Sequence, residues 1–484
     1  MQTYNTDVCV IAGGPAGLAA AISAAERGAE VILLEKANTT GGAGNMGMGP
    51  LGIGSRLAKG AMADLDAEKA FRIFMDYTHW RVDARLVRAY LEKSGDTIHW
   101  LEDMGVRFDS VAKYFPSSQA TWHIVKPESG KPGPRAASAM FKAMTDRAVE
   151  LGVKILYETP AVSLEKSDKG YINAVLAKDS AGNDVRVECL AAIIATGGFG
   201  DNPQMIKDRI GYEWGKDLFS FRIPGVVGDG IKMAMDVGAE STDVNIEMTV
   251  NSPGLADAGI SPSLWVQPKT LVLNNRCERI MNEELLENTT FAGNAVSIQN
   301  SRVAYSIVDS RVVDYYTKNG FDVVSLVHSY GLENFEQQAK QARANGFDNL
   351  YMADTVEELA AQMGLDEDAF KAAFDEYNTG CRDKEDYFYK HGKHLMALEK
   401  APFYAVRLHP SGYGTLGGIK INYKTEVLSK ENKPIEGLYA AGTDACSIFG
   451  VSYVFVLPGN TMGFALNSGR IAGESAAAYV FEEE

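Results

Sequence analysis

The sequence predicts an α/β fold with a Rossmann-like nucleotide-binding domain, and three observations support this. Residues 7–36 indicate a buried strand, a glycine-rich turn, an alanine-rich helix and a second strand. A further apolar strand, "LAAIIATGG", ends at Gly197 and Gly198, and another, "GLYAAGTDA", ends in a similar way near the C-terminus. Continuous apolar runs are typical of parallel strands buried on both faces. We therefore expect a nucleotide at the carboxyl ends of these strands.

The composition is that of a globular protein that binds small molecules. The 484 residues, 46% hydrophobic and 23% charged, allow two or three domains or one large domain with an insertion. A net charge of −16 argues against nucleic acid or an anionic membrane as partner. Five scattered cysteines without a C-x-x-C motif argue against an iron–sulfur cluster, zinc or attached haem, so no metal site is expected. Because no signal-peptide pattern or membrane-spanning run occurs, we expect a cytoplasmic location.

The first turn carries an imperfect dinucleotide-binding motif. The motif G-x-G-x-x-G would place a glycine at position 12, where the chain has Ala12, followed by Gly13, Gly14 and Gly17. A methyl group is tolerable at this turn if its backbone is not left-handed. Gly14 permits close approach of a phosphate, Gly17 permits close helix packing, and Glu35 ends the second strand, where an acid binds ribose hydroxyls. A structural turn in an unrelated α/β protein is the alternative.

The loop after the second strand favours FAD over NAD. It has the sequence "KANTTGGAGNMGMGPLG", which is long for a plain NAD domain and can wrap the far side of an extended cofactor. Further on, "KILYETPAVSLEK" is expected to form a strand pair in which Ala161 and Val162 lie along an adenine. With the two later glycine-ended strands, this succession resembles flavoproteins built from two dinucleotide-binding halves.

The most polar region, 331–400, is expected to be helical. Three segments, "ENFEQQAKQARANG", "DTVEELAAQMG" and "DEDAFKAAFDEYNTG", are each expected to end at their glycine. Asp354 or Thr355 is the expected N-cap of the second helix.

Several motifs together resemble the fumarate reductase/succinate dehydrogenase flavoprotein family over nearly the whole chain. They are "SGDTIHWLEDMGVRF", "ATGGFGDN", "GVVGDGIKMAMDVGA", "LVLNNRCERIMNEE", "PFYAVRLHPSGYGTLGGIKIN" and "GLYAAGTDACSIFG". The resemblance implies an FAD-binding domain of the glutathione-reductase type, residues 1–240 and 402–484, with an inserted α+β capping domain, residues 241–401. It also implies a substrate between cap and flavin, and hydride exchange between flavin N5 and a carbon–carbon bond next to an acyl or keto group. Some relatives attach FAD through a histidine in the loop after the second strand. Residues 38–52 contain no histidine, so we expect noncovalent FAD.

The residues expected to hold FAD follow from these motifs. They are Gly13, Gly14, Ala16, Gly17, Glu35, Lys36, Thr40, Gly41, Gly42, Gly44, Asn45, Val162, Thr196, Gly197, Asp229, Gly442, Thr443, Asp444, Thr461 and Met462.

Three positions differ from the dicarboxylate-reducing relatives, which hold their substrate with arginine and histidine. Counting along the matched motifs places Glu287 at the arginine proton donor, Tyr413 and Gly414 at the histidine pair, and Thr461 at the carboxylate-binding arginine. Without these cations, two buried carboxylates would be left unpaired, at several kcal/mol each. The stretch "SYVFVLPGNTMGFAL", residues 452–466, has no charged residue. It predicts a substrate less anionic than fumarate.

The same stretch resembles the 3-ketosteroid dehydrogenase branch of the family. That resemblance implies that the Tyr453 hydroxyl and the Gly459 N–H bind a ketone oxygen. The chain departs from this branch at Glu287, near which the steroid enzymes place a catalytic tyrosine. We expect Tyr413 to face the same oxygen and Glu287 to handle the proton. The alternative roles are a core tyrosine, a packing aromatic and a surface glutamate. The aromatic residues in segment 114–123 either line the slot or pack a surface loop.

The predicted function is an FAD-dependent ene-reductase or dehydrogenase acting on CH–CH groups beside a carbonyl, with an enone or 3-ketosteroid-like substrate. One alternative is a fumarate reductase-like enoate reductase with cations supplied by Arg81, Lys126 or Arg222. Another is a flavin-bound electron-transfer subunit without its own substrate. The expected partners are the small-molecule substrate and an external electron donor or acceptor.

Overall fold

The computed structural model describes residues 2–63, 65–324 and 331–482, and within these ranges the chain forms two compact units. The first unit contains residues 1–211, 222–246 and 414–484, and the second contains residues 212–221 and 247–413. None of the helices in these described ranges is long and apolar enough to cross a membrane. The cytoplasmic location stays a prediction.

The first unit is organised by an eight-stranded sheet with the order β14-β15-β8-β1-β2-β5, to which β7 and β6 are added beside β8. β1 pairs in parallel with β2 and β8, and β15 and β5 also join in parallel. The buried half of β1, Val8–Ile11, explains its continuous apolar run. The strands are β1 (Gln2–Ile11), β2 (Val31–Leu34), β5 (Lys154–Leu156), β6 (Ala161–Lys166), β7 (Ile172–Lys178), β8 (Asp184–Ile194), β14 (Glu426–Leu428) and β15 (Pro434–Ala440).

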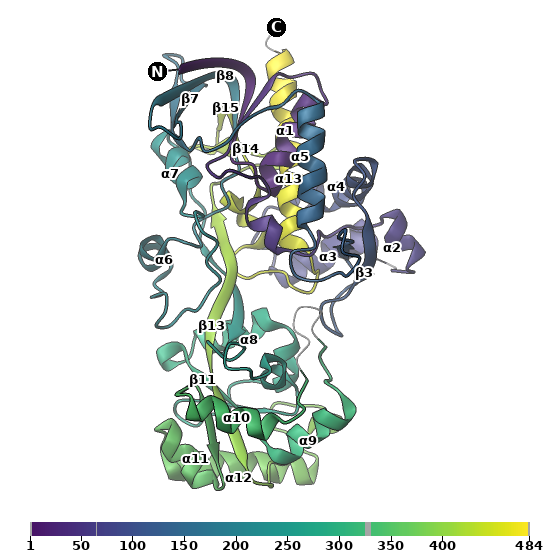
Figure 1. Cartoon of the computed structure of the whole chain (residues 1–484), viewed down its shortest axis with the longest axis vertical. Helices are drawn as coiled ribbons and strands as arrows, with labels where there is room; N and C mark the ends of the chain where they lie inside the picture. Colours follow the sequence, from purple (N-terminus) through teal and green to yellow (C-terminus); the bar gives the residue numbers. More distant parts are fainter. Residues whose placement is uncertain (1, 64, 325–330, 483–484) are drawn as a thin grey trace. The chain divides into compact units, whose positions relative to one another are not determined.

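Three helices of the first unit lie side by side against this sheet: α1 (Pro15–Ala25), α5 (Ser138–Glu150) and α13 (Asn460–Glu482) (Figure 1). α1 and α13 approach closely because α13 has glycines at the contact. A Cβ on Gly469 would lie 2.2 Å from the Ala16 carbonyl oxygen, and one on Gly473 would lie 2.2 Å from that of Ala20. The C-terminal helix is therefore packed directly on the helix that follows the first glycine turn.

The remaining elements of the first unit cover its edges and loops. They are η1 (Gly42–Met46), α2 (Arg56–Gly60), α3 (Ala67–Tyr77), α4 (Ala84–Asp103), β3 (Phe108–Ala112), β4 (Trp122–Val125), α6 (Pro203–Ile210), α7 (Asp229–Asp236), η6 (Gly442–Asp444), β16 (Ala445–Cys446) and η7 (Ser447–Phe449). β3 and β4 form a separate two-stranded antiparallel sheet.

The second unit is built on an antiparallel sheet with the order β10-β11-β13-β12. Its core contains the fully buried Trp265, Phe370 and Tyr404. β9 (Asn245–Asn251) and β13 (Phe403–Gly418) cross the boundary between the units along the chain. The other elements are η2 (Pro262–Val266), β10 (Leu271–Asn274), η3 (Glu283–Glu287), α8 (Thr289–Ser297), η4 (Asn300–Arg302), β11 (Ala304–Asp309), α9 (Ser310–Asn319), α10 (Phe335–Ala344), β12 (Leu350–Ala353), α11 (Val356–Met363), α12 (Glu367–Asp383) and η5 (Gly392–His394).

The α/β class and the parallel nucleotide-binding sheet predicted from the sequence are confirmed. The functional division at residues 240/241 and 401/402 stays a prediction. The compact units instead change at 246/247 and 413/414, and Tyr212–Phe221 belongs to the second unit.

Two local predictions were wrong. The segment "KILYETPAVSLEK" is not a strand pair, because β5 pairs with β2 while β6 pairs with β7. The third polar helix, α12, does not end at Gly380 but continues to Asp383. Gly380 instead admits a backbone contact, since a Cβ there would lie 2.5 Å from the Glu385 carbonyl oxygen. The second polar helix, α11, does end at its glycine, Gly364, and Thr355 is its N-cap, accepting a hydrogen bond from the Glu358 N–H at 3.1 Å.

Candidate functional site

The N-terminus of α1 has the features of a phosphate-binding turn. Gly14 is the N-cap, no side chain caps the helix, and Pro15 occupies its first position. A Cβ on Gly14 would meet no atom within 4 Å, so the space above the turn is open. Uncapped N–H groups and the helix dipole favour an anion in such a space. The diphosphate of a dinucleotide fits here.

Ala12 occupies the left-handed region, with φ of +81°. The condition under which an alanine methyl would be strain-free at this turn is therefore not met. A non-glycine residue in this region is disfavoured by roughly 1–2 kcal/mol. Two close backbone neighbours fix the conformation of Ala12. The Ala12 N–H donates to the Leu34 carbonyl at 2.7 Å, and the Gly17 backbone lies so close to the Ala12 oxygen that a Cβ on Gly17 would be 1.8 Å from it. Gly17 is thus required by close backbone contact.

Glu35 lies directly after β2 and is buried. Its carboxylate accepts hydrogen bonds from the Gly13 and Ala37 N–H groups, both at 2.7 Å. This arrangement fixes the carboxylate at the glycine turn, where an acid binds the ribose. Next to it, Lys36 forms an ion pair with Asp229 at 2.9 Å, so two further predicted cofactor residues are brought together.

The glycine-rich loop folds back over the same turn. The Gly41 N–H donates to the Gly13 carbonyl at 2.8 Å, and a Cβ on Gly42 would lie 3.5 Å from Gly14 Cα. Asn45 Nδ2 donates to the Thr40 carbonyl at 2.9 Å. Its continuation reaches α13, because a Cβ on Gly47 would lie 2.5 Å from Met462 Cε. One continuous backbone cradle therefore runs from the start of α1 to the start of α13.

Asp444 closes the cradle from the last strand of the sheet. The carboxylate has no exposed surface and accepts hydrogen bonds from Thr196 Oγ1 at 3.1 Å, Gly197 N at 3.1 Å and Gly198 N at 2.9 Å. Burial raises the pKa of the Asp444 carboxyl above its usual range, and these hydrogen bonds act in the opposite direction. Gly442 donates to Ser468 Oγ at 2.9 Å, which ties this turn to α13.

Val162 lies on β6 and is 49% exposed, so an apolar side chain is presented to solvent at the predicted adenine position. The adenine contact itself stays a prediction.

The uncharged segment 452–466 enters α13 through a tight turn. Gly459 has φ of +84°, and its carbonyl accepts the Leu51 N–H at 2.8 Å. A Cβ there would lie 2.8 Å from Trp122 Cδ1, so no larger residue fits without movement. The Tyr453 hydroxyl accepts the Thr461 N–H at 3.1 Å and thereby caps the first turn of α13. Tyr453, Gly459, Thr461 and Leu51 are therefore grouped at one end of the cradle.

Aromatic side chains surround this segment. Phe455 lies 4.6 Å from Tyr114 and 5.7 Å from Tyr453, between ring centroids, and Tyr114 lies 5.5 Å from Trp122. The segment carries no charge because it packs into this aromatic cluster, where a charge would be desolvated without a partner. Aromatic residues of segment 114–123 thus pack against segment 452–466, and their role in lining a substrate slot stays a prediction.

Sequence reasoning missed buried polar side chains in the first unit that pair with residues distant in the sequence. His123 is fully buried, with Nε2 2.7 Å from Ser55 Oγ and Nδ1 3.0 Å from the Thr121 carbonyl. Burial lowers the pKa of His123 to about 4, so the ring is neutral near pH 7. The Tyr90 hydroxyl donates to Asn460 Oδ1 at 2.7 Å. A histidine or tyrosine in a loop or helix gives no signal of such pairing when the partner is distant in sequence.

The second unit carries Glu287 and Tyr413 on different elements. Glu287 is the last residue of η3 and is partly buried, and Tyr413 lies on β13 and is 45% exposed. The Tyr413 ring stacks on Phe221 with an interplanar angle of 7°. Phe221 was not singled out by the sequence analysis.

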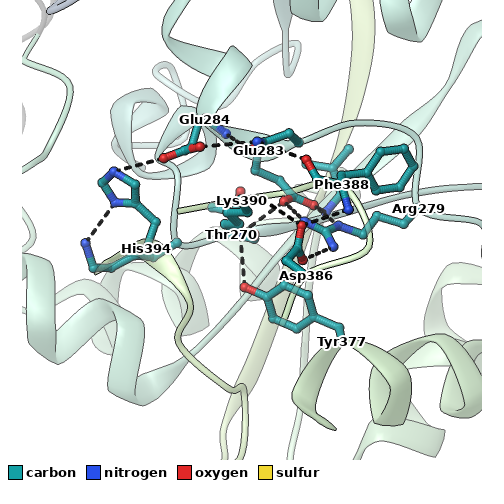
Figure 2. A network of polar contacts seen from close by, with 12 residues as sticks. Thr270, Arg279, Glu283, Glu284, Tyr377, Asp386, Phe388, Lys390 and His394 are labelled. Atoms are coloured by element: carbon teal, nitrogen blue, oxygen red, sulfur yellow. Dashed lines mark hydrogen bonds and ion pairs between the residues drawn. The ribbon is translucent and has the colours of Figure 1, made fainter. Parts of the chain in front are cut away.

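A buried charge network holds the element that carries Glu287. It consists of Arg279, Glu283, Tyr377, Asp386 and Lys390, and Figure 2 shows these side chains converging. Glu283 and Lys390 have fully buried side chains 3.0 Å apart, and Arg279 binds both oxygens of Glu283. Burial alone would raise the pKa of Glu283, but Lys390 and Arg279 outweigh it and hold that pKa below its usual range. Because Glu283 begins η3, the network fixes the start of the Glu287 element.

Comparisons with known proteins agree with this geometry. A family model described as FAD binding domain matches residues 7–461. A vinyl phenol reductase from Lactiplantibacillus plantarum is 32% identical over 497 residues, covering 99% of this chain and 97% of that protein. A probable fumarate reductase from Shewanella frigidimarina is 27% identical over 486 residues, covering 99% of this chain and 76% of that protein. The structure of a 3-ketosteroid-Δ4-(5α)-dehydrogenase from Rhodococcus jostii RHA1 superposes with a TM-score of 0.77 at 24% identity, covering 99% of this chain and 98% of that one.

The cradle fits the group that the family model implies. The open space above Gly14 and the uncapped helix start suit the diphosphate of FAD. The Glu35 carboxylate suits a ribose. Gly197, with φ of +93°, lies in the loop that follows β8, so this loop runs along the same edge of the sheet as the glycine turn. The residues that would hold FAD are thus those that the first unit gathers along the carboxyl ends of β1, β2, β8 and β15.

Proposed function

The chain belongs to the FAD binding domain family, and from that premise we propose that it reduces a carbon–carbon double bond conjugated to an uncharged oxygen-bearing group, a phenol or a ketone. The protein is an FAD-dependent oxidoreductase of the type that acts on CH–CH groups. The proposal concerns the substrate, and it retains the enone and 3-ketosteroid-like ketones expected from the sequence. An external electron donor supplies the two electrons to the flavin that the alkene then receives, and FAD is held noncovalently.

The observation that carries the proposal is the chemical character of segment 452–466. It contains no charged residue, and Tyr453, Gly459 and Thr461 gather among aromatic side chains at the end of the cradle. A dicarboxylate placed there would meet hydroxyl and amide groups in place of guanidinium groups. Leaving a buried carboxylate without its charged partner costs roughly 3–5 kcal/mol. An uncharged substrate avoids this penalty.

The vinyl phenol reductase supports the same substrate class. It matches this chain over nearly the whole length of both proteins, and its name specifies a phenol, which has no carboxylate. A phenol with a pKa near 10 is neutral at pH 7. Both a vinyl phenol and an enone carry an oxygen at the end of the conjugated system, so the same hydrogen-bond donors serve either substrate.

The chain's own residues hold the substrate and move a proton. Bound FAD supplies the hydride that reduces the double bond. The Tyr453 hydroxyl and the Gly459 N–H hold the substrate oxygen, and when the substrate is an enone, negative charge develops on that oxygen. A hydroxyl that accepts a hydrogen bond, as Tyr453 does from Thr461 N–H, becomes a stronger donor. Glu287 delivers the proton to the carbon that does not receive the hydride.

Among the cations that an enoate reductase would need, Arg222 is engaged elsewhere. Its Nε lies 2.6 Å from Asp201 Oδ1, so its charge is already paired within the first unit. This ion pair weighs against Arg222 as the cation that would bind the carboxylate of an enoate substrate. Lys126 and Arg81 are exposed.

The test is reoxidation of the reduced holoenzyme by a panel of acceptors under anaerobic conditions, followed by the flavin absorbance. The panel contains 4-vinylphenol, 2-cyclohexenone, 4-androstene-3,17-dione, an aryl-acrylate and fumarate. We expect the uncharged alkenes to reoxidise the flavin faster than fumarate. Fastest reoxidation by fumarate would refute the proposal. Reduced flavin that no alkene reoxidises would favour the electron-transfer subunit.

A further inference from the structure

The first unit contains a groove of about 400 Å³ whose lining shares no residue with the FAD cradle. It lies between α5 on one side and, on the other, residues 105–107 before β3 and residues 125–130 after β4. Among the residues that line it, Val106, Val125 and Met140 are buried and apolar. All of the lining belongs to one compact unit, so the shape of the groove is set within that unit.

The exposed lining of this groove carries more cations than acids. Arg107, Lys126 and Lys142 are exposed there, together with the acids Glu128 and Asp146. Lys142 binds Asp146 at 2.8 Å in the same helix. Arg107 and Lys126 form no ion pair with any side chain of residues 2–63, 65–324 and 331–482, which the structure describes. We call this lining the basic groove.

The chain around the basic groove is positively charged within an acidic protein. Residues 105–143 contain six lysines and arginines against two acids, whereas the whole chain has a net charge of −16. Lys131 and Arg135, in the loop between β4 and α5, add two exposed cations beside the groove. Because the Debye length is only about 8 Å at physiological ionic strength, a partner in contact with this face responds to its local positive charge.

The loop that carries these cations is bonded to the FAD cradle. The Val125 N–H donates to the Met48 carbonyl at 2.8 Å, and the Ala137 N–H donates to the Gly47 carbonyl at 3.1 Å. Both carbonyls belong to the continuation of the glycine-rich loop that folds over the turn before α1. On its other side, α5 packs against α1 itself. The basic groove and the cradle therefore share α5 and this loop as their common walls.

The reduction of an alkene consumes two electrons, which a donor outside the chain must bring to FAD. Complexes between electron-transfer proteins are often small and short-lived. Their rate of formation depends on complementary charge at the contact. Exposed cations around a groove next to the cofactor cradle are complementary to an acidic partner.

We propose that the basic groove docks an acidic one-electron carrier protein that reduces FAD. The inference rests on the proposed function only for its demand for electrons from outside. Two molecules of reduced carrier each lose one electron, and FAD takes up both electrons with one proton from solvent. The cations of the groove attract and orient the carrier, and they take no part in the chemistry of the alkene.

The test uses an acidic plant-type [2Fe–2S] ferredoxin as the carrier. Its binding to the oxidised holoenzyme is measured by isothermal titration calorimetry, and reduction of FAD by reduced ferredoxin is followed by anaerobic stopped flow. Arg107→Glu/Lys142→Glu reverses one charge on each wall of the groove. At low salt we expect Kd to rise and the second-order rate to fall about tenfold, because like charges slow encounter. The difference should shrink at high salt.

The matched control is Lys169→Glu/Lys430→Glu, which changes the net charge by the same amount. Both lysines are exposed in the first unit, in the turns between β6 and β7 and between β14 and β15. We expect this control to bind ferredoxin as the wild type does. An equal loss in the control would assign the effect to overall charge and overturn the inference. An unchanged Kd in the groove variant would overturn it as well. The neutral Arg107→Gln/Lys142→Gln should give an intermediate Kd.

A small reductant separates this inference from the proposed function. Photoreduced 5-deazaflavin should reduce FAD at the wild-type rate in the groove variant, and alkenes should reoxidise that variant normally. If ferredoxin bound through the groove and reduced FAD, but no alkene reoxidised it, the proposed function alone would be refuted. If alkenes reoxidised the flavin while ferredoxin did not bind and NADH alone reduced it, the docking site alone would be refuted.

Discussion

Lys390→Met should destabilise the second unit, because it removes one cation from the buried charge network. The Lys390 ammonium is fully buried and donates three hydrogen bonds: to Glu283 at 3.0 Å, to the Thr270 carbonyl at 2.9 Å and to the Tyr377 hydroxyl at 3.1 Å. Methionine fills a similar volume with no donor. Glu283 would keep Arg279 as its partner, while the Thr270 and Tyr377 oxygens would each lose a donor.

The magnitude follows from opposing contributions. Removing one partner of a buried pair costs roughly 3–5 kcal/mol when the other charge is stranded. Here Arg279 still neutralises Glu283, and the substitution also relieves the burial of the ammonium, which lowers the pKa of Lys390. We therefore expect a loss of about 3 kcal/mol in the free energy of unfolding, at the lower end of that range.

The assay is chemical denaturation of the holoenzyme, with a matched substitution in an exposed pair. Lys371 binds Glu357 at 2.8 Å, but both side chains are about half exposed. Lys371→Met should change the free energy of unfolding far less than Lys390→Met, because solvent screens an exposed pair. The flavin absorbance should report retained FAD in both variants, since the network lies in the second unit. If Lys390→Met were no more destabilising than Lys371→Met, the reasoning from burial would fail.

Three further results are expected. Glu287→Gln should slow flavin reoxidation by the alkene at least tenfold while FAD stays bound, since general acid catalysis contributes roughly 10²–10⁴-fold; an unchanged stopped-flow rate would assign Glu287 to the protein surface. Gly14→Ala should fold normally by circular dichroism yet retain little FAD, because the added methyl group occupies the open space over the helix start. Gly17→Ala should instead destabilise the fold, because its methyl group would clash with the Ala12 oxygen. Equal FAD content in Gly14→Ala and in the wild type would contradict the first expectation. Because the pKa of His123 is about 4 when folded against 6.5 unfolded, the unfolded chain binds more protons between these values. Stability should therefore rise with pH across that window by up to about 3 kcal/mol, and denaturation curves of His123→Gln should show a shallower dependence.

Much of the nucleotide-binding unit could be predicted because its signals are local. The apolar runs of β1, β8 and β15 indicate strands buried on both faces, and the glycines that follow them indicate close backbone contact. Glu35 was placed correctly at the end of β2 by counting along the chain. The left-handed φ of Ala12 was not predictable in this way, because contacts from Leu34 and Gly17 impose it against the residue's own preference.

The candidate catalytic residues show where local signals stop. Motif spacing singled out Tyr453 and Gly459, but not that the Tyr453 hydroxyl caps the helix at Thr461. His123 and Tyr90 were not singled out as partners within the first unit, since each pairs with a residue far away in sequence.

The sequence by itself determined the fold class, the cofactor and the reaction type, and it showed that segment 452–466 has no charged residue. Tertiary structure alone decided which distant side chains meet: Lys390 with Glu283 in one unit, and Phe221 with Tyr413 on neighbouring backbone segments. The physical reason is that the backbone conformation and the burial pattern of a segment depend on residues close to one another in the sequence. A side-chain pair instead depends on the register between segments that only folding brings together.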